Sequence, residues 1–225
     1  MIFKRLFDIV ASLLGLLLIW WIFPIVAFLI HKTMPGGPAF FCQKRVGKDG
    51  KLFPCHKFRS MTVKHSGSSV SVAGDSRITP FGAKLRHYKI DELPELFNIL
   101  KGDMSIVGPR PQLVRDMVFM TKVQRRRHKV PQGLTGLAQV SGRNNISWEE
   151  KLAYDQEYVK HITFLGDLKI IFKTIGNVLK KEDINTDGMA TAEDFGDYLL
   201  RTGQVDQETY DRKQRIARRI CEKNS

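Results

Sequence analysis

The feature that most constrains the fold is an uncharged run from Ile9 to Ile30 that contains a proline, Pro24. Its 22 residues are long enough for a transmembrane helix, which needs about 20 predominantly apolar residues. Proline removes a backbone donor and kinks a helix, however, and the part of the run before Pro24 is only about 22 Å long at about 1.5 Å per residue. A straight membrane span is therefore not the only interpretation.

Basic residues flank the run on both sides, at Lys4, Arg5, His31 and Lys32. A spanning helix normally carries its basic residues on one side only. We therefore expect residues 1–37 to form a re-entrant membrane helix that enters the bilayer, bends at Pro24 and leaves on the same cytosolic face. A proline-kinked transmembrane span is the alternative. Lys4 is spaced to pair with Asp8 on the next helical turn.

The remaining charge pattern points to anionic partners. The chain carries a net charge of +13, with +15 in residues 1–180 and −2 in residues 181–225. No helix-turn-helix, zinc-finger or RNA-binding aromatic motif is present, so we expect no nucleic-acid partner. Because the basic residues follow the apolar run, an anionic phospholipid membrane and phosphorylated substrates are favoured. Three cysteines without a Cys-x-x-Cys pair argue against a disulfide scaffold and a zinc site.

The downstream pattern predicts an α/β fold, in which a mostly helical catalytic domain with a small sheet occupies residues 38–180. We expect a hairpin over 39–61, helices over 84–100 and 114–129, and a glycine-rich loop over 133–143. A further helix opens with a capping box at Ser147. An apolar helix over 164–179 either packs in the core or lies on the membrane. We expect residues 181–225 to form a C-terminal extension that is acidic at first and then continues as a basic helix. Its acidic block, residues 182–211, either folds over the catalytic body or mediates self-association into a homo-oligomer.

The strongest cluster of candidate catalytic residues is the acidic pair Asp91 and Glu92. Adjacent side chains on a helix point about 100° apart, so the two carboxylates are suited to separate roles, one attacking and one holding a metal or a water. Pro94 is compatible with a first helical turn, which places Asp91 near a helix N-terminus. The alternative interpretation is a solvated acidic helix start.

Several cations lie beside chain breakers or on one face of a strand. Lys57 and Arg59 share a strand face, Arg86 shortly precedes the acidic pair, Arg110 is flanked by two prolines, and Arg143 ends the glycine-rich stretch. Fixed guanidinium and ammonium groups are suited to binding a pyrophosphate. As isolated surface cations they would serve only solubility.

Five motifs in this order resemble those of the bacterial sugar transferases, the monotopic phosphoglycosyl transferases, over roughly residues 1–180. They are Lys4-Arg5-Leu6-Phe7-Asp8, Lys57-Phe58-Arg59-Ser60-Met61, Asp91-Glu92-Leu93-Pro94-Glu95-Leu96-Phe97-Asn98, Gly102-Asp103-Met104-Ser105-Ile106-Val107-Gly108-Pro109-Arg110-Pro111, and Gly133-Leu134-Thr135-Gly136-Leu137-Ala138-Gln139-Val140-Ser141-Gly142-Arg143. The small size and the tail look most like the PglC type.

The resemblance implies transfer of a sugar 1-phosphate from a UDP-sugar to polyprenyl (undecaprenyl) phosphate with release of UMP. It assigns Asp91 as the nucleophile of a ping-pong reaction, Glu92 as its partner in metal or proton handling, and Mg²⁺ as the cofactor, held by Asp91 and Glu92. It also implies a re-entrant helix broken at Pro24, on the cytoplasmic face of the bacterial inner membrane. The PglC type suggests an N-acetylated sugar. A non-enzymatic membrane-surface adaptor that binds anionic lipid is the competing hypothesis, and it has no use for the acidic pair.

Overall fold

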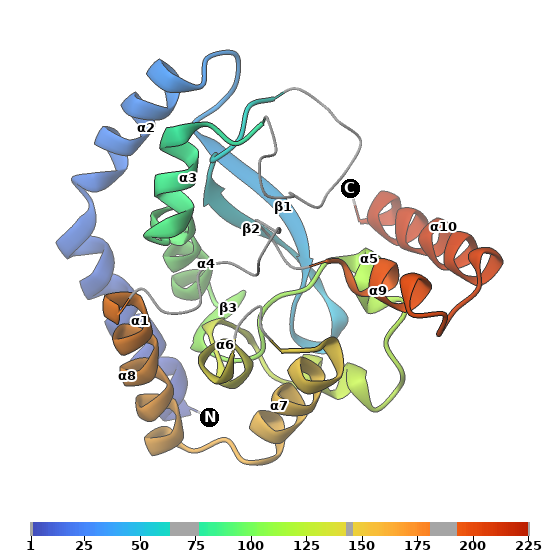
Figure 1. Cartoon of the computed structure of the whole chain (residues 1–225). Coiled ribbons are helices and arrows are strands. Elements are labelled where there is room, and N and C mark those ends of the chain that lie inside the picture. The colour runs from blue at the N-terminus through green and yellow to red at the C-terminus, as the bar shows by residue number, and fades with distance from the viewer. Residues whose placement is uncertain (1, 64–76, 143–145, 181–192, 225) are drawn as a thin grey trace.

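The computed structural model describes residues 2–63, 77–142, 146–180 and 193–224, and helices surround two small sheets (Figure 1). The α-helices are α1 (Ile2–Ile19), α2 (Ile22–Thr33), α3 (Pro80–His87), α4 (Glu95–Lys101), α5 (Val114–Met117), α6 (Leu137–Ser141), α7 (Trp148–Lys160), α8 (Phe164–Lys180), α9 (Phe195–Arg201) and α10 (Gln207–Lys223). The strands are β1 (Phe40–Val46), β2 (Leu52–Phe58), β3 (Met104–Val107) and β4 (Gln132–Thr135), and the 3-10 helices are η1 (Lys48–Gly50), η2 (Ile90–Glu92) and η3 (Gln124–Lys129). The prediction of a mostly helical fold is confirmed, but the strands form two separate pairs.

The apolar run forms two helices, α1 and α2, that meet at an angle of 61°. Pro24 lies in the first turn of α2, and its missing N–H leaves the carbonyl of Trp20 without the usual helical donor. The amide of Phe23 donates to that carbonyl instead, at 3.2 Å. The break therefore precedes Pro24 by about one turn, a small correction to the predicted bend. Within the described ranges no single helix is long and apolar enough to cross a membrane, whereas this bent pair satisfies length and composition together.

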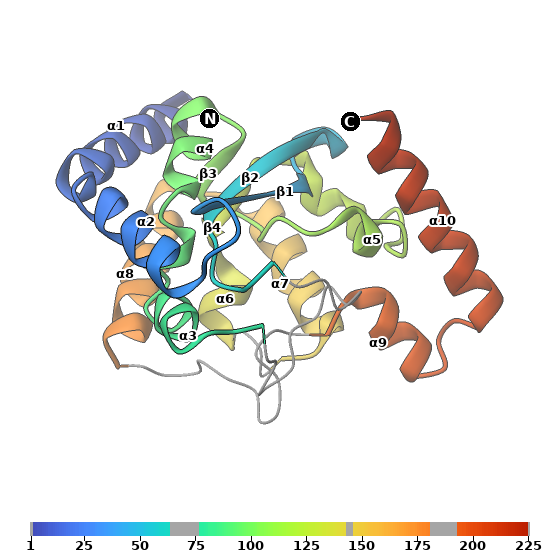
Figure 2. The ribbon, with the colours of Figure 1, turned by 90° about the horizontal axis from the view of Figure 1, so that it is seen from above.

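The outward faces of α1, α2 and α8 carry large exposed apolar side chains. Leu18 is 73% exposed, Phe28 66%, Phe172 70% and Leu179 76%. These three helices lie together at one side of the molecule, opposite α10, in both ribbon views (Figures 1 and 2). On α8 the opposite face, with Asp167 and Ile170, is buried, so the helix packs on the domain and still presents an apolar stripe. Apolar patches of this extent mark a membrane or partner surface.

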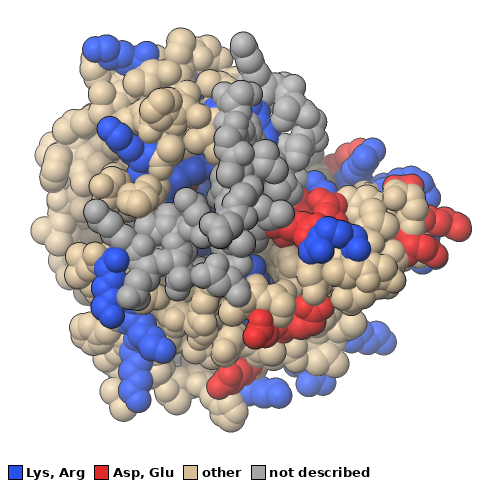
Figure 3. Space-filling model, in the orientation of Figure 1, with Lys and Arg blue, Asp and Glu red and all other residues tan. Residues whose placement is uncertain are grey.

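Charges are also unevenly distributed on the face seen in Figure 3. Acidic side chains gather towards the side that holds α7, α9 and α10, whereas the side of α1, α2 and α8 shows lysines and arginines among uncharged surface. A surface that combines exposed apolar groups with cations is suited to an anionic bilayer. Binding to anionic lipid remains a prediction.

The predicted hairpin is confirmed. Strands β1 and β2 pair antiparallel, from Phe40 opposite Phe58 to Val46 opposite Leu52. Asp49 at the tip adopts a left-handed conformation (φ 55°), which aspartate tolerates better than most residues. Because side chains alternate along β2, Lys57 shares a face with the buried Phe53 and points to the site described below, whereas Phe58 packs on the opposite face.

The stretch 133–143 was predicted to be a loop, but its described residues, 133–142, contain most of β4 and all of α6, so that prediction is wrong. Strand β4 pairs parallel with β3. Its glycine serves close packing of two backbone segments: a Cβ on Gly133 would lie 2.1 Å from the amide nitrogen of Gly108. A glycine can be recognised in the sequence, but the backbone segment that packs against it cannot.

Two predicted long helices are also corrected. The apolar pattern over 84–100 is divided among α3, η2 and α4, because Lys89 adopts a left-handed conformation (φ 57°) that ends the first helix. The pattern over 114–129 is divided between the short α5 and η3. The capping box is confirmed: the Ser147 hydroxyl accepts from the Glu150 amide, and the Glu150 carboxylate accepts from the Ser147 amide.

The described part of the C-terminal extension packs on the domain at α5 and α7. Phe195, Leu199 and Ala217 join a core cluster with residues of α5 and α7. The Phe195 amide donates to the buried Asp116 carboxylate at 2.9 Å. Folding onto the body is thus observed for α9 and α10, and self-association stays a prediction.

Asp116 makes folding stability dependent on pH. Burial, and next the nearby Asp194, raise the pKa of Asp116 to about 7, against the opposing effects of the hydrogen bond from the Phe195 amide and then of Arg115 and Arg45. The unfolded chain releases this proton near the ordinary value of 3.8. Between about pH 4 and 7 the folded state therefore binds more protons than the unfolded state, and the free energy of unfolding should fall as pH rises through this window.

The variant Asp116→Asn should remove that loss. Its side-chain oxygen can still accept from the Phe195 amide, so we expect a higher Tm than wild type at pH 8 and a nearly equal Tm at pH 4, measured by thermal unfolding in detergent. Asp211→Asn, at an exposed position of α10, is the control. An equal gain at both pH values would contradict the account.

Candidate active site

Asp91 and Glu92 lie in η2, a single turn between α3 and α4. Ile90 and Leu93 on either side pack against an apolar cluster that contains Phe58. The two carboxylates are thereby carried into the interior, where each residue is only 8% exposed. The alternative of a solvated acidic helix start is therefore wrong.

Glu92 is held by two of the predicted cations. Lys57 Nζ lies 2.9 Å from Glu92 Oε1, and the Arg110 guanidinium pairs with both carboxylate oxygens. Burial alone would raise the pKa of Glu92, but Arg110 and then Lys57 outweigh it and hold that pKa well below its ordinary value. Glu92 is thus ionised and fixed in place.

Asp91 is in a different environment. Its Oδ1 is buried and has no hydrogen-bond partner among the described residues. Burial, and next the charge of Glu92, raise the pKa of Asp91 to about 6, although Lys57, Lys89 and Arg86 act in the opposite direction. The two carboxylates therefore lie in different environments, and of the two Asp91 is the one with an uncommitted oxygen. That they have separate roles stays a prediction.

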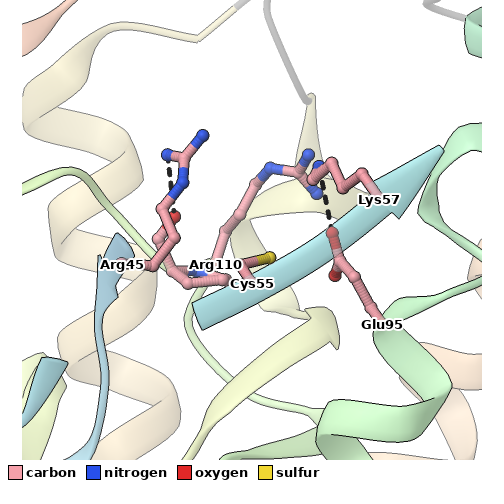
Figure 4. Close-up of a pocket in the computed structure, with 6 residues that line it drawn as sticks. Arg45, Cys55, Lys57, Glu95 and Arg110 are labelled. Carbon is pink, nitrogen blue, oxygen red and sulfur yellow. Dashed lines mark hydrogen bonds and ion pairs between the residues drawn. The ribbon is translucent and has the colours of Figure 1, made fainter. Parts of the chain in front are cut away.

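A third carboxylate, Glu95, belongs to the same cluster. It is 1% exposed, and its Oε1 lies 3.0 Å from Lys57 Nζ, so that Lys57 bridges Glu92 and Glu95. Figure 4 shows Glu95 and Lys57 at one small pocket with Arg45, Cys55 and Arg110. Sequence reasoning included Glu95 in a motif but gave it no role. Its position one helical turn after Asp91 is the signal that could have identified it.

The other predicted substrate-binding cations lie in different places. The Arg86 Nε donates to the Ser60 hydroxyl at 2.8 Å, and the positive charge of Arg86 acts to lower the pKa of Asp91. Arg59 is turned to the chain that follows α2, where it donates to the carbonyls of Met34 and Gly37. The structure thus brings Lys57, Arg86 and Arg110 to the acidic pair, whereas Arg59 secures the helix-to-strand connection. Arg143 lies outside the described residues.

The residues present fit Mg²⁺ in one particular way. Magnesium commonly binds one or two carboxylates together with substrate phosphates. Asp91 offers a buried oxygen without a partner, whereas both Glu92 oxygens are engaged by cations. The described residues contain no group of three or more metal-binding side chains that could hold an ion without substrate. Glu92 could become a ligand only by exchanging its ion pairs.

The first motif joins α1 to the catalytic body. Lys4 does not pair with Asp8, as its spacing suggested, but donates to Asp167 Oδ2 at 2.6 Å and to the Val107 carbonyl at 2.9 Å. Asp8 instead accepts from the Ile106 amide at 3.0 Å. Both contacts reach β3, directly before the Pro109–Pro111 turn. The motif therefore positions the apolar helix against the strand that leads to Arg110.

Comparison with known proteins places most of the chain in one family. The family model described as "Bacterial sugar transferase" matches residues 1–181, which include both the helix α1 and the acidic pair. The chain belongs to the bacterial sugar transferase family. Within this sugar transferase, the matched part ends just after α8, so α9 and α10 lie beyond it.

Two groups of relatives differ in length. The sugar transferase is 43% identical over 195 residues to the uncharacterized sugar transferase EpsL of Bacillus subtilis, covering 87% of this chain and 96% of EpsL. It is 40% identical to the undecaprenyl-phosphate galactose phosphotransferase of Salmonella typhimurium and 43% identical to the UDP-glucose:undecaprenyl-phosphate glucose-1-phosphate transferase of Klebsiella pneumoniae. The match to the Salmonella protein includes 80% of this chain but only 41% of that protein. The match to the Klebsiella protein includes 78% of this chain but only 40% of that protein.

Proposed function

We propose that this protein transfers a sugar 1-phosphate from a UDP-sugar to undecaprenyl or another polyprenyl phosphate, with release of UMP. The observation that carries the proposal is the buried Asp91, whose Oδ1 has no partner among the described residues, beside a Glu92 held by Lys57 and Arg110. The names of the Salmonella and Klebsiella relatives describe transfers to undecaprenyl phosphate, which supports the same reaction class.

In the first half-reaction the Asp91 carboxylate attacks the sugar-bearing phosphorus of the diphosphate. A bond forms between the carboxylate oxygen and phosphorus, the bond to the oxygen that bridges to UMP breaks, and UMP leaves with that electron pair. In the second, an oxygen of polyprenyl phosphate attacks the same phosphorus and releases Asp91. A covalent intermediate divides one difficult displacement into two easier ones.

The neighbouring residues supply positive charge and hold the carboxylates in position. Arg110 and Lys57 keep Glu92 ionised and orient it next to the nucleophile, and with Arg86 they supply positive charge for the phosphoryl oxygens. Mg²⁺, held by Asp91 together with substrate phosphates, would neutralise charge on the diphosphate and on leaving UMP. Ionisation of Asp91 is required for attack, and its raised pKa keeps the carboxylate a good nucleophile near neutral pH.

Position at the membrane follows from the second substrate. A polyprenyl phosphate presents its phosphate at the bilayer surface, so the acidic pair must lie close to that surface. We propose that α1, α2 and the apolar face of α8 hold the protein on the cytoplasmic face of the bacterial inner membrane. The exposed side chains of these helices support this placement. An adaptor that only binds anionic lipid would leave the burial of three carboxylates around Lys57 without a purpose.

The test is release of UMP by the purified full-length protein in detergent, with undecaprenyl phosphate, Mg²⁺ and a panel of UDP-sugars. The panel contains UDP-glucose and UDP-galactose, whose sugars appear in the relatives' names. It also contains N-acetylated UDP-sugars, which the resemblance to the PglC type suggests. We expect UMP release that requires both Mg²⁺ and the lipid phosphate for continuous turnover. Salt-sensitive liposome binding without UMP release from any member would overturn the proposal in favour of the adaptor.

A further inference from the structure

The basic run Arg125 to Lys129 contains an arginine that is fully buried. Arg127 is 0% exposed and is the largest of the fully buried side chains, whereas its neighbour Arg126 is exposed. A buried guanidinium must be paired, since desolvating an unpaired charge is costly. Its partners therefore indicate what it does.

The Arg127 guanidinium joins α7 to the turn that carries Arg110. Its Nε donates to Asp155 Oδ2 at 2.8 Å, and its Nη2 lies 2.8 Å from the same oxygen. The same Nη2 donates to the backbone carbonyl of Arg110 at 2.7 Å. Asp155 is itself only 4% exposed and lies on the inner face of α7. The ion pair thus ends on the backbone of a residue whose side chain contacts Glu92.

The rest of the turn is fixed by other contacts. The Pro109 carbonyl accepts from the Gly133 amide at 2.9 Å, and Pro111 restricts Arg110 to extended backbone conformations. Within these limits, rotation about the Arg110 peptide would still swing its side chain. The hydrogen bond from Arg127 fixes that peptide. Arg110 thereby presents its guanidinium to Glu92 before substrate binds.

Stability alone does not account for such a pair. Taking two charges out of water costs so much that well-packed apolar residues of similar volume often replace a buried ion pair without loss. We propose that Arg127, held by Asp155, is a positioning residue that fixes the Arg110 backbone and so keeps the Arg110 guanidinium on Glu92. The expected effect on catalysis rests on the proposed function, whereas the fixing of the Arg110 backbone does not.

The variant Arg127→Lys tests the proposal, because a single ammonium can pair with Asp155 but cannot reproduce the two-sided guanidinium bridge. We expect kcat/KM for UMP release to fall about 10- to 100-fold, mostly in kcat. In the background of Arg110→Ala, the same change should cost less than about twofold, since the group that it positions is absent. Equal losses in both backgrounds would show a merely structural role and overturn the proposal. Arg126→Lys, at the exposed neighbouring position, should leave both rates unchanged.

A second measurement does not depend on activity. Hydrogen–deuterium exchange of the peptide that spans residues 104–118 should be faster in Arg127→Lys than in wild type or Arg126→Lys. If exchange is the same in all three proteins, the inference fails even where activity changes. If wild type releases no UMP but exchange follows this pattern, the proposed function fails and the positioning contact stands.

Discussion

Replacing Asp91 by Asn should reduce kcat for UMP release by roughly 10³-fold or more, because the amide has nearly the same shape but cannot attack phosphorus. The measurement is initial UMP release at saturating UDP-sugar and undecaprenyl phosphate. Thermal unfolding should show that the variant folds, since the change removes a buried carboxylate whose pKa is already raised by burial.

Asp49→Asn provides the matched control for that experiment. Asp49 is exposed at the hairpin tip, and asparagine tolerates its left-handed backbone. We expect wild-type turnover from this variant. If Asp91→Asn releases UMP as fast as Asp49→Asn, Asp91 is not the nucleophile.

The second large effect concerns the attachment of α1. The variant Lys4→Met should lower stability by about 3–5 kcal/mol, because it leaves Asp167 buried without its cation. Among the residues that the structure describes, only the Tyr158 hydroxyl, at 2.9 Å, would remain as a hydrogen-bond partner of the Asp167 side chain. For a chain of this size such a loss corresponds to a fall in Tm of about 10 °C, measured by thermal unfolding in detergent.

Two further variants isolate the ion pair as the cause. Lys169→Met removes a lysine from an exposed position on α8 and should change Tm little. Lys4→Met combined with Asp167→Leu removes both charges and should recover much of the loss. A Lys4→Met protein as stable as Lys169→Met would mean that the contact does not hold α1 to the domain.

Local sequence patterns were sufficient for the elements whose signals are contiguous. The hairpin over 39–61, the capping box at Ser147 and the apolar helix 164–179 were all predicted, because turn residues, a cap and a helical period lie within a few residues of each other. The prediction for 84–100 failed at Lys89. A left-handed lysine depends on the packing of η2 and has no local signal.

In the candidate site, too, residues within motifs were predictable, whereas contacts between distant residues were not. The acidic pair, Lys57 and Arg110 were identified from motifs, and the structure brings them together although Lys57 and Glu92 are 35 residues apart. Lys4 with Asp167, 163 residues apart, and Arg127 with Asp155 were not predicted. One sequence offers many cations and many carboxylates, and only tertiary packing decides which of them meet in the interior.

The central claim is that Asp91 becomes covalently linked to the sugar phosphate. Intact-protein mass spectrometry of wild type mixed with a UDP-sugar and Mg²⁺, without lipid acceptor, tests it most directly. We expect an adduct with the mass of one sugar phosphate and a matching amount of released UMP. The adduct should be lost when undecaprenyl phosphate is added, and it should not form on Asp91→Asn. Steady product formation with the lipid acceptor, without any adduct or UMP release in its absence, would contradict the covalent mechanism.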